Sequence, residues 1–201
     1  MNAHDKLMAK APAPASDRGS AAGGNGTKNF SHGYPVCCVS IGLEIAGQVV
    51  LGVVYDPNRD ELFTALKGQG AHLNGRRIAV SEVADLGEAL IITGFARSSE
   101  AQFQLLAELE RRSHGIRRDG SAALNLCYVA AGRLDAFWES GLAPWDMAGG
   151  GLVLLEAGGM LTDLGGRPFG LRNRQVLATN VRLHRQMVEV IAPRLTGLLS
   201  Q

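Results

Sequence analysis

Three consecutive glycines inside a helical pattern constrain the fold more than any other feature of this sequence. Pro144 and the two residues after it open a helix whose apolar pattern covers residues 147–157, and Gly149, Gly150 and Gly151 lie inside that pattern. Each glycine in an exposed helix costs about 1 kcal/mol relative to alanine. We therefore expect another backbone to pack directly against this helix, at a distance that leaves no room for side chains.

A series of short apolar runs precedes the helix, and turn residues separate them. This pattern predicts an antiparallel meander of strands. Farther along the chain, apolar runs typical of buried strands alternate with segments that have one apolar helical face. The expected strands cover residues 36–45, 49–55, 61–66, 77–81, 90–94 and 134–139, and the other expected helices cover 100–112, 122–131 and 182–191.

Charge and composition argue against two classes of protein. The 201-residue chain has 20 Lys and Arg against 19 Asp and Glu, a formal net charge of +1, which argues against nucleic-acid binding through bulk charge. Charges or glycines interrupt every apolar run before it reaches the roughly 20 residues of a membrane span. Cys37, Cys38 and Cys127 have no C-x-x-C spacing, which favours reduced thiols and a cytoplasmic location.

The amino-terminal segment differs in composition from the rest of the chain. It is rich in Ala, Pro, Ser and Gly, and it has neither a sustained apolar period nor the apolar centre of a secretory signal. We expect residues 1–25 to form a mobile low-complexity tail. Residues 26–201 are expected to form one domain, a size that a single hydrophobic core can serve.

Two segments carry residues suited to phosphate chemistry. Asp146 lies in the first turn of a helix, where backbone amides and the helix dipole keep a carboxylate ionised and able to hold a hard cation. Gly26 and Thr27 form a turn that can offer backbone amides and a hydroxyl to an oxyanion. Ordinary structural roles stay open for both segments, because Asp146 could be a helix cap and Asn25-Gly26 a plain turn.

Further motifs accompany these two segments in order along residues 23–180. They are Asn29-Phe30 with His32-Gly33, Gly52 to Pro57, Gly68 to Ala71 with Leu73-Asn74-Gly75, Gly120 to Ala123, and Trp145-Asp146 with Gly158-Gly159. Together the motifs resemble the inositol monophosphatase family of metal-dependent phosphomonoesterases. The resemblance implies a layered α/β (α+β) sandwich of sheets and helices, and hydrolysis of inositol 1-phosphate or a similar sugar phosphate by water that Mg²⁺ activates.

The resemblance also implies roles for individual residues. Thr27 would orient the attacking water, and Asp146 would bind the metal. The expected substrate contacts are Gly26, Gly120, Ser121, Ala122 and Glu139. From the residues alone, Ser121 could equally be a helix N-cap and Glu139 an acid at the end of a strand.

The sequence departs from its family at the metal-binding stretch. The family has Asp-Pro-Ile/Leu-Asp-Gly-Thr where this chain has Ala22-Gly23-Gly24-Asn25-Gly26-Thr27. Ala22 has no ligand atom, and Asn25 offers only a neutral amide oxygen, a weak ligand for a divalent cation. The family's upstream glutamate pair and amino-terminal helices have no counterpart at matching spacing. We therefore expect weak Mg²⁺ binding and impaired activity.

Two alternatives to this function stay open at this stage. The chain could be a non-catalytic remnant or a partner-binding protein of the same family. It could also act on the related nucleotide or fructose bisphosphate substrates, which need the same metal chemistry. Because relatives are commonly dimers, the resemblance also makes a homodimer one of the expected states.

Overall fold

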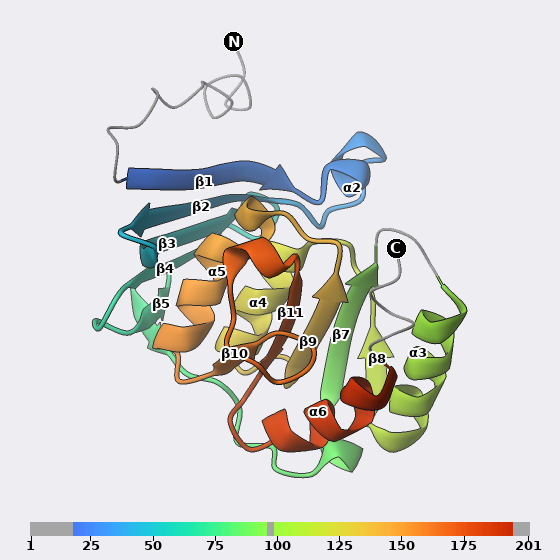
Figure 1. Cartoon of the computed structure of the whole chain (residues 1–201). Helices are drawn as coiled ribbons and strands as arrows, with labels where there is room; N and C mark the ends of the chain where they lie inside the picture. The colour runs from blue at the N-terminus through green and yellow to red at the C-terminus, as the bar shows by residue number, and fades with distance from the viewer. Residues whose placement is uncertain (1–17, 96–98, 195–201) are drawn as a thin grey trace.

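The computed structural model describes residues 18–95 and 99–194, which fold into alternating layers of sheet and helix. Figure 1 shows α4 and α5 between a six-stranded and a five-stranded sheet, with α3 and α6 against the far face of the second sheet. The layered α+β class expected from the sequence is confirmed. The helices are α2 (Thr27–Ser31), α3 (Glu100–Arg112), α4 (Ala122–Ala130), α5 (Pro144–Glu156) and α6 (His184–Ile191), with 3-10 turns η1 (Leu86–Glu88), η2 (Leu171–Asn173) and η3 (Ala192–Arg194).

The first sheet is the expected antiparallel meander. All six of its strands follow one another both in sequence and in space, with β1 at the edge beside β2. Its last strand is shorter than the predicted run over 77–81. The strands are β1 (Arg18–Asn25), β2 (Cys38–Ile45), β3 (Gln48–Asp56), β4 (Glu61–Leu66), β5 (Ala71–Leu73) and β6 (Arg76–Ile78).

Strand β1 corrects the prediction of a mobile tail over residues 1–25. Residues 1–17 lie outside the described part of the chain, but Arg18–Asn25 pairs along its whole length with β2, from Arg18 opposite Ile45 to Asn25 opposite Cys38. The prediction failed there because Gly, Ala and Ser are poor strand formers by composition. Ladder hydrogen bonds join backbone groups, so a neighbouring strand can hold such residues in place.

The second sheet is mixed in strand direction. Strand β7 (Leu90–Phe95) pairs in parallel with β8 (Gly115–Arg117) and with β9 (Ala136–Ser140). Strand β11 (Gln175–Thr179) runs antiparallel to β9 and to β10 (Met160–Thr162). The two strands expected at 90–94 and 134–139 are confirmed with small shifts. No helix in the described ranges is long and apolar enough to cross a membrane.

Helix α5 lies directly on the first sheet, as its glycines predict. A Cβ atom added to Gly149 would lie 2.7 Å from the Ile41 carbonyl oxygen, and one added to Gly42 would lie 2.5 Å from Ala148 Cβ. A Cβ at Gly52 would collide with the Gly149 backbone. This close contact fixes the height of α5 above β2 and β3 and so places its first turn, which carries Asp146.

Candidate active site

The predicted site residues gather where three helices begin. Helix α2 starts at Thr27, α4 at Ala122 and α5 at Pro144. Asn25 ends β1 immediately before α2, and hydrogen bonds join it to the first turns of α4 and α5. We call Asn25, Ser121 and Asp146 the junction, because these three side chains connect the three helix starts.

Asn25 is the central member of the junction. It is only 7% exposed. Its Nδ2 donates to Asp146 Oδ1 at 2.6 Å, and its Oδ1 accepts from Ser121 Oγ at 2.8 Å. The Ala123 N–H approaches the same Oδ1 at 3.4 Å. The amide therefore uses both of its ends inside the protein.

Asp146 is held by neutral hydrogen-bond donors. Its Oδ2 accepts from the Ala143 N–H at 2.9 Å, and its Oδ1 accepts from Asn25. The bond to Ala143 is the helix-capping role that the sequence left open. The neighbouring Trp145 is 46% exposed, and its Cδ1 would lie 3.0 Å from a Cβ at Gly23, so β1 and the start of α5 are in contact.

Ser121 lies at the N-cap position of α4, but its hydroxyl does not cap the helix. It is completely buried, donates to Asn25, and lies 3.6 Å from the Cys38 thiol. Burial raises the pKa of Cys38 to about 12, so this thiol stays protonated. Ala122 follows with its side chain in the hydrophobic core, so it could meet a ligand only through its backbone.

Glycine geometry fixes the two turns that flank the junction. Gly26 has φ of 81°, and a Cβ there would lie 2.5 Å from the Val36 carbonyl oxygen. Gly120 has φ of 88°, and a Cβ there would lie 3.1 Å from Asn29 Nδ2. Both turns require glycine. Thr27, the predicted water-orienting residue, follows Gly26 and is exposed.

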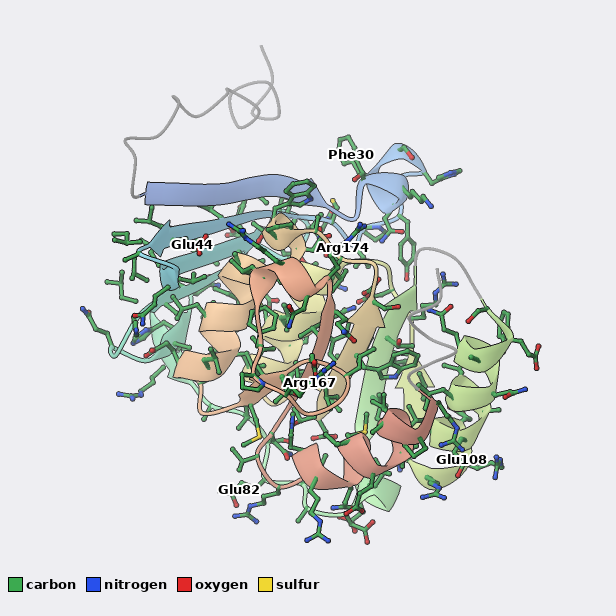
Figure 2. All side chains as sticks on the ribbon, in the orientation of Figure 1. Phe30, Glu44, Glu82, Glu108, Arg167 and Arg174 are labelled. Atoms are coloured by element: carbon green, nitrogen blue, oxygen red, sulfur yellow. The ribbon has the colours of Figure 1, made fainter. Side chains whose placement is uncertain are left out.

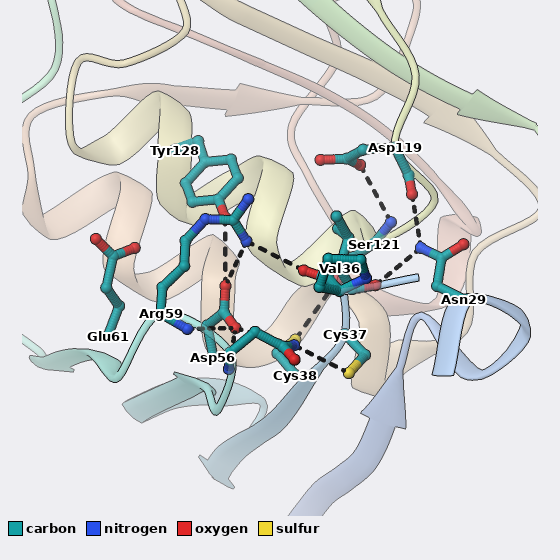
Figure 3. Close-up of polar contacts among 12 residues, drawn as sticks. Asn29, Val36, Cys37, Cys38, Asp56, Arg59, Glu61, Asp119, Ser121 and Tyr128 are labelled. Carbon is teal, nitrogen blue, oxygen red and sulfur yellow. Dashed lines mark hydrogen bonds and ion pairs between the residues drawn. The ribbon is translucent and has the colours of Figure 1, made fainter. Parts of the chain in front are cut away.

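Asn29 and Asp119 support these turns, and neither was predicted as a site residue. Asn29 Nδ2 donates to the carbonyl oxygens of Asp119 at 2.6 Å and of Val36 at 2.8 Å, as Figure 3 shows. Burial raises the pKa of the Asp119 carboxyl, although the Ser121 N–H opposes the rise. Asn29 did belong to a recognised motif, but its two acceptors are backbone atoms, which no side-chain pattern reveals.

Glu139 approaches the site from β9. It pairs with Gly94 of β7, and a Cβ at Gly94 would lie 2.5 Å from the Glu139 carboxylate. Burial raises the pKa of Glu139 to about 8, and the charge of Asp146 adds to the rise while Arg118 opposes it. Glu139 is thus electrostatically coupled to the junction and carries a proton at neutral pH.

The charged groups at this end of the molecule do not form a divalent-cation site. In residues 18–95 and 99–194, no group of three or more His, Cys, Asp or Glu could hold a metal ion. Both Asp146 oxygens already accept hydrogen bonds, and Asn25 turns its NH₂ toward them. Mg²⁺ requires near-octahedral oxygen ligands and prefers carboxylates. The donors around Asp146 therefore do not fit the Mg²⁺ that the family resemblance implies.

Glu82 and Glu108 cannot complete the donor set, because they lie far from the junction. Phe30 on α2 and Arg174, whose carbonyl accepts from the Gly141 N–H at 2.8 Å, lie at the junction end of the molecule. Figure 2 shows Glu82 and Glu108 toward the opposite end. Glu108 is paired there with arginines of its own helix.

Sequence comparison finds a family model and relatives that match most of this chain. Residues 25–197 match the model of the Inositol monophosphatase family. The chain is 44% identical over 172 residues to "Inositol-1-monophosphatase" of Synechocystis sp., covering 84% of this chain and 60% of that protein. It is 47% identical over 165 residues to "Inositol monophosphatase 2" of Solanum lycopersicum, covering 79% and 62%. The chain thus spans about three fifths of the length of these curated relatives.

Solved structures agree with the sequence relatives. An inositol monophosphatase from Anabaena (Nostoc) sp. superposes with a TM-score of 0.85 at 38% identity, covering 90% of this chain and 74% of that chain. The extragenic suppressor protein suhB from Bartonella henselae superposes with a TM-score of 0.85 at 41% identity, covering 88% and 69%. Asn25, Ser121 and Asp146 all lie within residues 25–197, which match the family model.

Proposed function

The chain belongs to the inositol monophosphatase family, and we propose that its junction acts on phosphate monoesters of polyols, with inositol 1-phosphate or a similar sugar phosphate as substrate. The observation that carries the proposal is the meeting of three helix starts at Asn25, Ser121 and Asp146. Helix starts present unpaired N–H groups and the positive end of the helix dipole, which favour an anion such as phosphate.

The proposal gives the chain's own residues separate tasks. The turns at Gly26 and Gly120 present backbone amides to the phosphate, beside the exposed Thr27 hydroxyl. Glu139, which keeps its proton up to about pH 8, can donate a hydrogen bond to a hydroxyl of the polyol. Asp146 stands at the position of a metal-binding aspartate of the family, so the reaction would take place next to its negative charge.

Hydrolysis by this chain is proposed to be slow. In the family as the resemblance describes it, Mg²⁺ neutralises the phosphate charge and activates water. The donors around Asp146 do not fit that ion, so no hydrolytic step is assigned through it. Without that neutralisation, the negative charge of the phosphate is not balanced in the transition state, and turnover falls.

A second candidate is a non-catalytic protein that binds phosphate esters or a partner. The observation that favours it is the hydrogen bond from Asn25 Nδ2 to Asp146 at 2.6 Å, which occupies the carboxylate. The two candidates differ in one measurable quantity, the release of inorganic phosphate.

Phosphate release from inositol 1-phosphate, with Mg²⁺ present, tests the proposal. We expect slow release by the wild-type chain, well below the roughly 1–1,000 s⁻¹ of ordinary enzymes. Asp146→Asn should abolish it, while Asn173→Asp, an exposed change in η2, should leave it intact. Release that survives Asp146→Asn would mean that the reaction centre lies elsewhere. If wild-type protein releases no phosphate, the non-catalytic candidate replaces the proposal.

The outer face of the first sheet supports association into homodimers, which we include in the proposal. Helices α4 and α5 pack against its inner face (Figure 1), and the outer face pairs Ile41 with Val53 and Leu43 with Leu51. Leu66, opposite Leu51, is 44% exposed. A contiguous apolar face of this kind favours contact with a second copy. Sedimentation velocity across a concentration series measures this association.

The three free cysteines agree with the proposed cytoplasmic location.

A further inference from the structure

Asn25 is the residue of the junction whose side chain faces the Asp146 carboxylate, so it decides whether that charge meets a neutral group or a cation. We infer that Asn25 excludes divalent cations from Asp146, so that a neutral amide takes the place of a cation in this chain. The inference rests on the proposed function, because it concerns the selectivity of the same junction. It assigns to Asn25 a role beyond weak metal ligation.

The hydrogen bonds fix which end of the amide faces Asp146. The Asn25 oxygen accepts from Ser121 Oγ at 2.8 Å and from the Ala123 N–H at 3.4 Å. If the amide turned over, its NH₂ would face the Ala123 N–H, and its oxygen would face the Asp146 carboxylate. Donor would then oppose donor, and acceptor would oppose acceptor. The orientation with NH₂ toward Asp146 is therefore the one that these neighbours select.

Burial raises the free-energy cost of any rearrangement. Asn25 is 7% exposed and Ser121 is fully buried, so water has little access to replace a lost hydrogen bond. A buried donor that loses its acceptor incurs its full desolvation cost. A cation at Asp146 would have to offset this loss, and it would also displace the charge-assisted bond from Asn25.

The backbone at Asn25 is held in one place. Asn25 itself pairs with Cys38 in the β1–β2 ladder. The next residue, Gly26, has a left-handed φ of 81° and lies against the Val36 carbonyl. Strand and turn together hold the Asn25 Cα, so the side chain cannot withdraw from Asp146 through a shift of the main chain.

Cation binding measured without substrate tests the inference. Mn²⁺, observed by the loss of its free electron paramagnetic resonance signal, would be titrated into wild type, Asn25→Asp, Asp146→Asn and the double variant Asn25→Asp/Asp146→Asn. We expect the Asn25→Asp variant to bind Mn²⁺ at least tenfold more tightly than wild type, and the double variant to lose that gain. The variant Asn173→Asp adds the same charge at an exposed position and should bind like wild type.

Wild-type protein alone can also overturn the inference. If wild type binds Mn²⁺ at micromolar concentration and Asp146→Asn removes that binding, Asn25 does not exclude the cation. Equal affinities for wild type and a folded Asn25→Asp variant would overturn it too. If Asn25→Asp fails to fold, the comparison of wild type with Asp146→Asn decides, and equal weak affinities support the inference. No substrate is present, so these outcomes are independent of whether the chain hydrolyses phosphate esters.

Discussion

Two carboxylates of this protein, Asp56 and Asp146, have opposite surroundings. Asp56 ends β3 with its side chain fully buried, and Arg59 Nη1 donates to its Oδ2 at 3.0 Å (Figure 3). The Asn58 N–H donates to its Oδ1 at 2.8 Å. Asp146 is partly buried, and the donors that reach it among the described residues are an amide and a backbone N–H, both neutral.

The difference separates an acid whose charge the protein balances from an acid whose charge it does not balance. The charge of Asp56 is balanced by a guanidinium from its own hairpin, so that carboxylate needs nothing from outside the chain. The charge of Asp146 meets hydrogen bonds but no cation from the described residues, and Glu139 responds to it electrostatically. Asp56 therefore helps to hold its own hairpin together, whereas the charge of Asp146 acts on its neighbour Glu139.

The largest expected effect comes from removing Asp56. Asp56→Ala leaves Arg59 and the Asn58 N–H without their acceptor, and we expect it to lower the free energy of unfolding by about 3 kcal/mol. Asp146→Asn keeps an acceptor oxygen, and we expect a loss of about 1 kcal/mol. Urea unfolding followed by circular dichroism measures both values.

An exposed ion pair provides the control for this comparison. Glu189 pairs with Arg185 at 2.8 Å with its side chain 60% exposed, so Glu189→Ala should change stability little. The contrast between the two carboxylates fails if Asp146→Asn costs as much as Asp56→Ala. In that case Asp146 would be a structural acid as well.

A smaller effect concerns pH, because Glu139 keeps its proton in the folded state up to about pH 8, whereas its ordinary pKa is 4.5. Between these values the unfolded chain releases a proton that the folded chain retains, so stability falls as pH rises and then levels off above about pH 8. Allowing for solvent screening, we expect this contribution to be about 2 kcal/mol.

Glu139→Gln isolates the contribution of Glu139, because glutamine has no proton to release. The difference between the stability curves of wild type and variant should grow from pH 5 to pH 8. Asp146→Asn should move the upper end of that window to lower pH, since the Asp146 charge helps to raise the pKa of Glu139. A flat difference curve would show that the pKa of Glu139 is not raised in the folded protein, and an unchanged window in Asp146→Asn would show that Glu139 is not coupled to the junction.

The sequence predicted the fold best where apolar side chains recur at regular spacing. Residues 100–112 have one apolar face and form α3 as expected, and the glycines of α5 do meet the backbone of β2. Strand β1 was missed because its small residues have no such pattern. Strands β8 and β10 were missed because three residues are too few to show a period.

The sequence named the three junction residues separately and did not indicate the hydrogen bonds that join them. Asn25, Ser121 and Asp146 were each named from motifs. The hydrogen bond between Asn25 and Asp146 spans 121 positions, and no local pattern indicates it. The direction of the Asn25 amide depends on Ala123, whose backbone position only the fold defines.

The rate of phosphate release after restoring the acidic stretch tests the central claim most directly. The claim is that the scaffold of the site is intact while its donor set is not. Wild type and Ala22→Asp/Asn25→Asp would be assayed together on inositol 1-phosphate with Mg²⁺, after circular dichroism confirms that both are folded. We predict at least ~100-fold faster release by the restored variant, because charge stabilisation of that order depends on the missing groups. Wild-type release as fast as that of the folded variant would contradict the claim.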